Sequence, residues 1–128
     1  MAGRYDITIE QGASFSLPIT LNHYDNTAYN LTGYTGRGQL RRYHRSTDII
    51  VSFTVTIDPT PTTGRLIVSL TAVQTGAIPA GEEITDTRSK YVYDLELEKT
   101  SAGGDSVAIG TVKRVLEGTA YVSPEVTR

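Results

Sequence analysis

Apolar and polar side chains alternate along several short stretches of this chain. The clearest stretch runs from Ile49 to Ile57, where the odd-numbered residues are apolar and the later even-numbered residues are Ser or Thr. A period of two places one kind of side chain on each face of a β-strand. Phe15–Leu21 has the same period, and Pro18 within it favours an edge strand or a bulge, because proline has no N–H to donate.

Shorter stretches rich in β-branched and aromatic residues predict further strands at 5–9, 34–43, 65–70, 91–97 and 107–122. Within 91–97 the tyrosines and leucines share one face. Asp94, Glu96 and Glu98 lie on the opposite face, which should meet water or a basic partner. In the last stretch the apolar positions change phase, and this slip predicts a β-bulge near Glu117–Gly118.

One segment between the predicted strands is not strand-like. Thr71 is suited to cap a short helix and Pro79 must lie beyond its end, so we expect about one or two helical turns here. Around it, about seven or eight short strands with frequent turn signals predict an all-β, antiparallel β-sandwich. The 128 residues contain no repeat and no linker, which favours a single domain over residues 1–128.

Composition excludes several classes of protein. The chain has no cysteine, so it has no disulfide, no cysteine-based zinc site and no thiol nucleophile. The net charge of −2 argues against a dedicated nucleic-acid binder. No apolar run approaches the roughly 20 residues of a membrane helix, so we expect no membrane partner.

Candidate reactive residues are scattered rather than convergent. The two histidines are His23 and His44, and no Gly-x-Ser-x-Gly motif accompanies them. The densest acidic group is Glu82, Glu83 and Asp86, which we interpret as a solvated loop, with a loop-bound cation as the alternative. We therefore expect no catalytic residue, no cofactor and no metal site.

A cluster of arginines is the one uneven feature of the charge pattern. Four arginines fall within nine positions, and two tyrosines bracket most of the cluster. The six residues are Arg37, Arg41, Arg42 and Arg45, with Tyr34 and Tyr43. Arginine and tyrosine are enriched at protein interfaces. We interpret these six residues as a candidate protein interface. The alternative is an exposed sheet edge that its charges protect from aggregation.

Four segments stand out when they are taken together in chain order. They are Ile-Glu-Gln-Gly-Ala-Ser-Phe at 9–15, Asn-Leu-Thr-Gly-Tyr-Thr at 30–35, the stretch from Gly81 through Tyr-Val-Tyr-Asp-Leu-Glu-Leu at 91–97, and Val-Leu-Glu-Gly-Thr-Ala-Tyr-Val-Ser-Pro-Glu-Val-Thr-Arg at 115–128. As an ordered set they resemble small virion structural proteins of tailed bacteriophages and, more distantly, the N-terminal domain of phage upper baseplate proteins.

The resemblance implies an Ig-like β-sandwich with an architectural, non-enzymatic role in the virion. It implies other phage structural proteins as partners, repetition as a homo-oligomer, and no catalytic residues. Residues 82–90 form a longer and more polar insertion than the family pattern has, and the sequence stops at Arg128, where upper baseplate proteins continue into a fibre-like region. We therefore expect a tail or baseplate adaptor that helps to attach tail fibres or neighbouring baseplate parts.

Two other roles remain open at this point. A small, cysteine-free, threonine-rich sandwich also suits a capsid decoration, or cement, protein. A host-glycan-binding module would use exposed aromatic side chains, for which the tyrosines are the supply.

Overall fold

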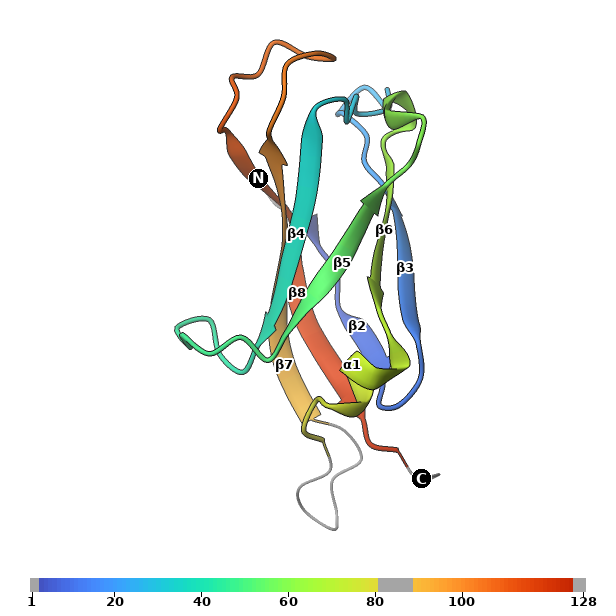
Figure 1. Cartoon of the computed structure of the whole chain (residues 1–128), viewed down its shortest axis with the longest axis vertical. Helices are drawn as coiled ribbons and strands as arrows, with labels where there is room; N and C mark the ends of the chain where they lie inside the picture. The colour runs from blue at the N-terminus through green and yellow to red at the C-terminus, as the bar shows by residue number, and fades with distance from the viewer. Residues whose placement is uncertain (1–2, 81–88, 126–128) are drawn as a thin grey trace.

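The structure, a computed structural model, describes residues 3–80 and 89–125. Within these residues it contains eight strands, one 3-10 turn and one short helix (Figure 1). The predicted all-β fold with one short helix is confirmed. No helix in the described part is long and apolar enough to cross a membrane. The elements are β1 Gly3–Arg4, β2 Ile7–Glu10, β3 Phe15–Thr20, β4 Tyr34–Arg41, β5 Val51–Ile57, η1 Pro61–Thr63, β6 Arg65–Leu70, α1 Ala72–Gly76, β7 Ser89–Lys99 and β8 Val112–Ser123.

The strands form one sheet that folds over along β5. Its hydrogen-bonded order is β1-β8-β7-β4-β5-β6-β3, with β2 also on β8. The first half of β5 pairs with β4, as in Gly38 opposite Phe53, and its second half pairs with β6, as in Ile57 opposite Leu66. The two layers, β4-β7-β8 and β5-β6-β3, have the strand order of the two sheets of immunoglobulin domains. The expected Ig-like sandwich is confirmed, although β1 and β2 pair with β8 in parallel rather than antiparallel.

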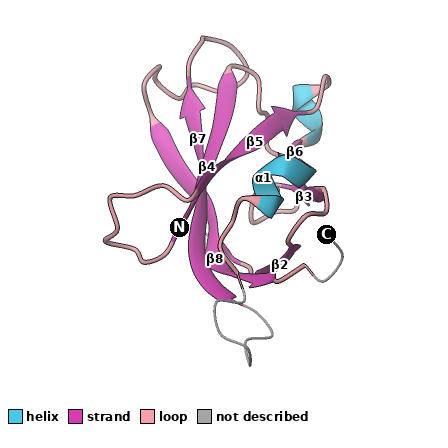
Figure 2. Cartoon of the chain, turned by 60° about the horizontal axis from the view of Figure 1, so that its bottom comes forward, coloured by secondary structure: helices cyan, strands magenta, loops and turns pink. Residues whose placement is uncertain are grey.

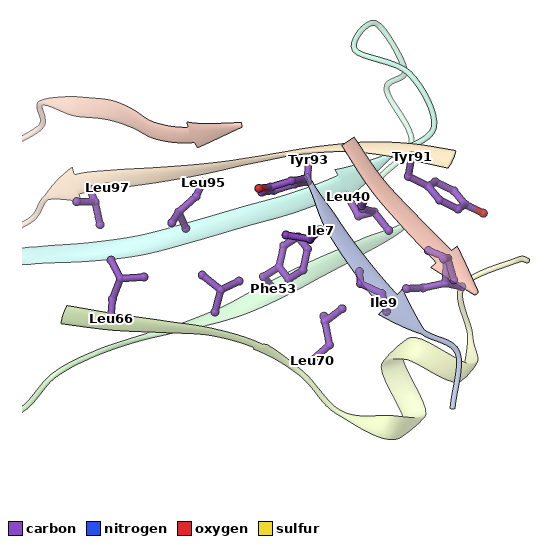
Figure 3. Close-up of a cluster of buried hydrophobic side chains, with 14 of the residues drawn as sticks. Ile7, Ile9, Leu40, Phe53, Leu66, Leu70, Tyr91, Tyr93, Leu95 and Leu97 are labelled. Carbon is purple, nitrogen blue, oxygen red and sulfur yellow. The ribbon is translucent and has the colours of Figure 1, made fainter. Parts of the chain in front are cut away.

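The core fills the space between the two layers (Figure 3). Phe53 packs tilted against Phe15 with ring centres 6.3 Å apart, and edge-on against Tyr93 with ring centres 6.1 Å apart. This row of aromatic rings joins β3, β5 and β7 across the sandwich. It occupies the region where antibody domains carry an inter-sheet disulfide, which this chain cannot form. Aliphatic side chains from both layers complete the core, among them Ile9, Leu40, Leu66, Leu70, Leu95, Leu97 and Val122.

The strand predicted from Ile49 begins two residues later. Ile49 is 46% exposed and precedes β5, whereas Ile50 packs against the core and donates its N–H to Leu40 O at 2.8 Å. The incoming loop thus reaches the sheet at Ile50, and strict alternation starts only at Val51. Ile49 therefore does not face the core, although the alternation in the sequence begins with it.

β3 is an edge strand, as Pro18 indicated, because it pairs only with β6 among the described strands. Leu21 donates its N–H to Gly64 O at 2.8 Å. Since the direction of donation alternates along an antiparallel strand, the nitrogen of Pro18 faces away from β6. The free side of β3 therefore lacks a donor at its centre, which discourages pairing with another strand.

The β-bulge lies at Val115 rather than at Glu117–Gly118. Leu95 is opposite Leu116 and Glu96 is opposite Arg114, so Val115 is the extra residue of β8. Gly118 serves a different purpose, because a Cβ at this position would lie 2.1 Å from Tyr5 O. The glycine permits the close approach of the segment between β1 and β2.

The short helix α1 forms as predicted (Figure 2), and its predicted cap at Thr71 is confirmed. Thr71 Oγ1 accepts from Gln74 N at 3.1 Å, and Gln74 Oε1 accepts from Thr71 N at 2.9 Å, which completes a capping box. The helix leads to Pro79, whose carbonyl accepts a hydrogen bond from the Tyr91 hydroxyl. Tyr91 lies near the start of β7. A tyrosine at this place in an Ig-like sandwich, with its hydroxyl hydrogen-bonded to the backbone upstream, is known as the tyrosine corner.

Candidate functional site

The six residues of the candidate interface do not form one surface. β4 alternates between an outward face, which carries Arg37 and Arg41, and an inward face, which carries Tyr34 and Leu40. Arg42, Tyr43 and Arg45 follow in the β4–β5 loop, residues 42–50. The structure therefore divides the cluster into a sheet-face part, a loop part and a buried part.

Arg37 is paired within its own sheet. It lies opposite Glu96 on β7, and its guanidinium contacts Glu96 Oε1 and Glu98 Oε1, each at 3.1 Å. Cross-strand pairs of opposite charge support a sheet modestly. The charge of Arg37 is therefore paired with carboxylates of the same chain.

The acidic face of β7 meets basic side chains of its neighbouring strands. Besides the contacts of Arg37, Asp94 Oδ2 lies 3.5 Å from the Nε of Arg114, which also contacts Glu117 at 3.4 Å. Partial burial, followed by the nearby charge of Glu96, raises the pKa of Asp94. The β7 carboxylates, which were expected to meet water or a basic partner, thus contact arginines on β4 and β8 of the same chain.

Arg41 fastens the β4–β5 loop. Its Nη1 donates to Ser46 O at 2.5 Å and its Nη2 donates to Gln39 Oε1 at 2.8 Å. Ser46 N in turn donates to Tyr43 O at 3.1 Å, which closes a turn at the loop tip. Arg41 therefore fixes the shape of the loop.

Arg42 packs against the tyrosine corner. Its guanidinium lies 5.3 Å from the centre of the Tyr91 ring, and its Nη1 donates to the Tyr91 hydroxyl at 3.4 Å. A cation over an aromatic face is attracted by the negative charge of that face. Arg42 thereby joins the loop to β7.

The tip of the loop is exposed. Tyr43 is 68% exposed, and His44 and Arg45 are exposed beside it. Next to the tip lies a shallow hollow of about 620 Å³, lined by Arg4, Arg42, Tyr43, His44, Ser89, Lys90, Val92 and Thr119. No carboxylate is among these described lining residues. We call the loop tip and this hollow the basic end of the molecule.

Tyr34 lies at the opposite end of β4 and does not belong to the basic end. It is 6% exposed, and its hydroxyl donates to Asp105 Oδ2 at 2.7 Å. The ammonium of Lys99 lies 4.8 Å from the centre of its ring. The expectation that Tyr34 and Tyr43 flank one surface was wrong, because Tyr34 begins the eight-residue strand β4, whereas the loop that carries Tyr43 follows the other end of that strand.

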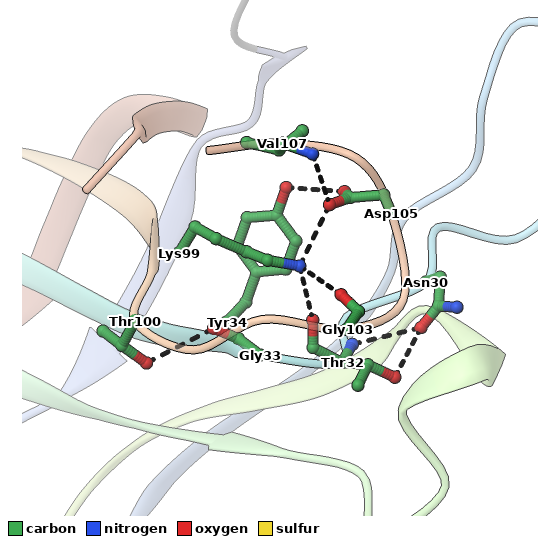
Figure 4. A network of polar contacts seen from close by, with 9 residues as sticks. All are labelled: Asn30, Thr32, Gly33, Tyr34, Lys99, Thr100, Gly103, Asp105 and Val107. Atoms are coloured by element: carbon green, nitrogen blue, oxygen red, sulfur yellow. Dashed lines mark hydrogen bonds and ion pairs between the residues drawn. The ribbon is translucent and has the colours of Figure 1, made fainter. Parts of the chain in front are cut away.

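A buried lysine organises the end of the sandwich around Tyr34 (Figure 4). Lys99 is 1% exposed, and its ammonium donates to Thr32 O at 3.0 Å, to Asp105 Oδ1 at 3.0 Å and to Gly103 O. Each of its three protons thus has an acceptor, as burial of a charge requires. These contacts hold the β7–β8 loop, residues 100–111, against the segment that precedes β4. We call Lys99, Asp105 and Tyr34 the Lys99 clamp.

The electrostatics of the clamp are those of a stabilised ion pair. The hydrogen bond from Tyr34, followed by that from Lys99, lowers the pKa of Asp105 to about 2. Burial, followed by the hydrogen bond to Asp105, raises the pKa of Tyr34 to about 12. Both groups therefore keep one charge state over the physiological range, which suits a structural role better than proton transfer.

The structure brings together no set of residues suited to metal binding or nucleophilic catalysis among the positions that it describes. No group of three or more His, Asp or Glu side chains converges there. His23 stacks on Tyr29 with ring centres 4.1 Å apart, and the Asp25 carboxylate accepts from Thr27 instead. The acidic group of Glu82, Glu83 and Asp86 lies outside the described residues.

Comparison with known proteins gives distant structural likeness alone. No family model and no curated protein matches the sequence. A structure of Tim-1 is 10% identical with a TM-score of 0.35 over 100% of this chain and 99% of that one. A voltage-gated sodium channel β subunit analysed for multimeric cell-adhesive interactions is 12% identical, with a TM-score of 0.36 over 97% and 93%.

The extracellular domain of the sodium channel β4 subunit, a parallel homodimer, is 10% identical with a TM-score of 0.34 over 98% and 96% of the two chains. Likeness at this level carries no argument about what the chain binds.

Proposed function

We propose that this chain is a non-enzymatic structural protein of a tailed-phage virion. In this proposal it is an adaptor in the tail or baseplate that helps to attach tail fibres or neighbouring baseplate parts. The proposal is supported by the four ordered segments at 9–15, 30–35, 81–97 and 115–128. It is also consistent with the engagement of Lys99, Asp105 and the β7 carboxylates in contacts that support the fold.

The basic end is the observation that carries the adaptor role. Tyr43 and Arg45 are exposed on a loop that Arg41 already fastens, so little conformational entropy is lost when a partner binds. Tyrosine and arginine are the residue types that dominate binding energy at interfaces. Lys90 beside the loop adds positive charge, which favours an acidic surface on the neighbouring virion protein.

Repetition in the particle is part of the same proposal. Virion parts repeat by symmetry, so we expect this chain as a ring or other closed homo-oligomer in the assembled particle. The free side of β3 is a poor place for that contact, because Pro18 removes its central donor. The loops at the two ends of the sandwich are better suited.

Mass spectrometry of purified virions, separated into heads and tails, tests the proposal. We expect this chain in the tail fraction at a copy number that matches a ring. Recovery with heads alone would replace the adaptor role with that of a capsid decoration protein. Absence from both fractions would contradict a virion role altogether.

A further inference from the structure

A second groove lies at the end of the sandwich opposite the β4–β5 loop. It lies between residues 22–29 and the first residues of β8, and it has a volume of about 910 Å³. Figure 1 shows both segments at the upper end of the molecule, whereas the β4–β5 loop lies at the lower end. Its lining combines three aromatic side chains, one carboxylate and two cations, namely His23, Tyr24, Tyr29, Asp25, Lys113 and Arg114.

The loop that forms one wall of the groove is held by its own hydrogen bonds. His23 N donates to Thr27 O at 2.8 Å, and Asn26 N donates to His23 O at 2.9 Å, with Asn26 in the left-handed region at a φ of 67°. Asp25 Oδ1 accepts from Thr27 N at 3.0 Å and from Thr27 Oγ1 at 2.5 Å. The loop therefore presents its side chains without needing to order itself on binding.

The aromatic side chains of this loop offer flat apolar faces at the surface. Tyr24 is fully exposed at the loop tip. Behind it, the rings of His23 and Tyr29 stack with an interplanar angle of 21°. An aromatic face with a hydroxyl at its edge suits a ligand that has both an apolar face and polar edges, as a sugar ring has.

The charges of the groove divide into a donor side and an acceptor side. Arg114 is paired with Asp94 and Glu117, but Lys113 has no ion pair among the described residues, and its ammonium lies 5.8 Å from the centre of the Tyr34 ring. Hydrogen bonds from Thr27 lower the pKa of Asp25, so its carboxylate stays ionised and can accept from hydroxyl groups. Lys113 thus provides a positive charge for an anionic group, and Asp25 provides an acceptor.

We propose that this groove binds an acidic saccharide, whose ring packs against Tyr24 and the His23–Tyr29 pair while its carboxylate pairs with Lys113. Asp25 accepts hydrogen bonds from the hydroxyl groups of the sugar. An acidic peptide such as polyglutamate would also satisfy Lys113, but it lacks the hydroxyl groups that the Asp25 carboxylate would accept from and the ring that would pack against Tyr24. This proposal does not depend on the adaptor role, since the groove and the basic end lie at opposite ends of the molecule.

Titration calorimetry of the full chain with hexagalacturonate tests the proposal. The fully methyl-esterified oligosaccharide has the same rings without the carboxylates, and hexaglutamate has carboxylates without the rings. We expect hexagalacturonate to bind, and both of the other probes to bind about tenfold more weakly or not at all. Binding should weaken with added salt, because it includes a charge pair at the surface.

Two variants locate the binding. Tyr24→Ala and Lys113→Gln should each weaken the affinity for hexagalacturonate by about tenfold. Tyr43→Ala, at the basic end, is the matched control and should leave the affinity unchanged. Because Tyr24 is fully exposed, its variant keeps the test valid even if Lys113→Gln disturbs the fold.

The proposal is overturned if hexagalacturonate does not bind at millimolar concentration, if hexaglutamate binds equally well, or if Tyr24→Ala retains full affinity. Failure of the adaptor role would appear separately, as absence of the chain from purified virions.

Discussion

The Lys99 clamp and the basic end place similar side chains in opposite circumstances. Each places at least one cation and a tyrosine near an end of β4. At the clamp, Lys99 is buried and all of its protons have acceptors within the chain. At the basic end, Tyr43 and Arg45 are exposed. The comparison indicates that the first set stabilises the fold, whereas the second is available to a partner.

The difference has a physical cause in desolvation. A buried ammonium loses its hydration, so it is tolerated only where acceptors replace the lost water. Gly33 and Gly103, with φ of 81° and 116°, let the backbone beside the ammonium adopt the turns that place two of these acceptors, Thr32 O and Gly103 O. An exposed arginine keeps its hydration and needs no such arrangement.

The largest expected effect is the loss of the buried cation. Lys99→Met keeps most of the side-chain volume but removes the ammonium donor from Thr32 O and Gly103 O and the cation from Asp105. We expect the free energy of unfolding to fall by about 3 kcal/mol. Urea denaturation measures it, and Arg45→Met is the matched control, with an expected change within about 0.5 kcal/mol. Equal stability of the two variants would remove the distinction between the two ends.

The second prediction concerns acid. The pKa of Asp105 is about 2 in the folded chain, below its ordinary value of 3.8. Its contribution to stability is therefore present above pH 3.8 and is lost as the pH falls toward 2. We expect the melting temperature of the native chain to drop through this window. Asp105→Asn should start from a lower melting temperature and lose less of it over the same range.

Asp94 serves as the internal check on that measurement. Its pKa is raised in the folded chain, so protonation of this residue favours the folded state as the pH falls. Asp94→Asn should therefore not flatten the acid dependence. If it does so as strongly as Asp105→Asn, the acid sensitivity does not originate at the clamp.

Much of the fold could be predicted from the sequence, because its signals are local. The period of two, together with the content of β-branched and aromatic residues, located the major strands, and Thr71 identified the helix cap. The bulge was predicted too late along β8, because the alternation of apolar and polar residues is visibly out of phase only after the extra residue, near Glu117–Gly118. The extra residue, Val115, is defined by the partner strand β7, which the pattern of β8 alone does not contain.

The Lys99 clamp could not be predicted in the same way, because its contacts join positions 67 and 71 residues apart. One signal was nevertheless present. Tyr91, Tyr93, Leu95 and Leu97 face the core at every second position, and Lys99 continues the same series. A lysine in an inward position requires acceptors nearby, and this would have directed attention to Asp105.

A smaller effect is expected at the root of the β4–β5 loop. Arg41→Ala removes the donors to Ser46 O and Gln39, both in partly exposed surroundings. We expect the free energy of unfolding to fall by about 1 kcal/mol or less. Amide hydrogen exchange should accelerate within residues 42–50 and remain unchanged in the β7–β8 loop. Faster exchange across both loops would mean that the two ends are not independent.

The smallest effect on stability is expected at the loop tip, together with the largest effect on assembly. Tyr43→Ala combined with Arg45→Glu changes two exposed side chains, so the free energy of unfolding should change by within about 0.5 kcal/mol. Loss of an aromatic anchor and reversal of a charge should nevertheless prevent docking on an acidic partner. We expect the double variant to be absent from purified virions, whereas Arg65→Glu, on the exposed side of β6, is incorporated normally. Normal incorporation of both variants would show that the arginines of the loop only protect an exposed surface.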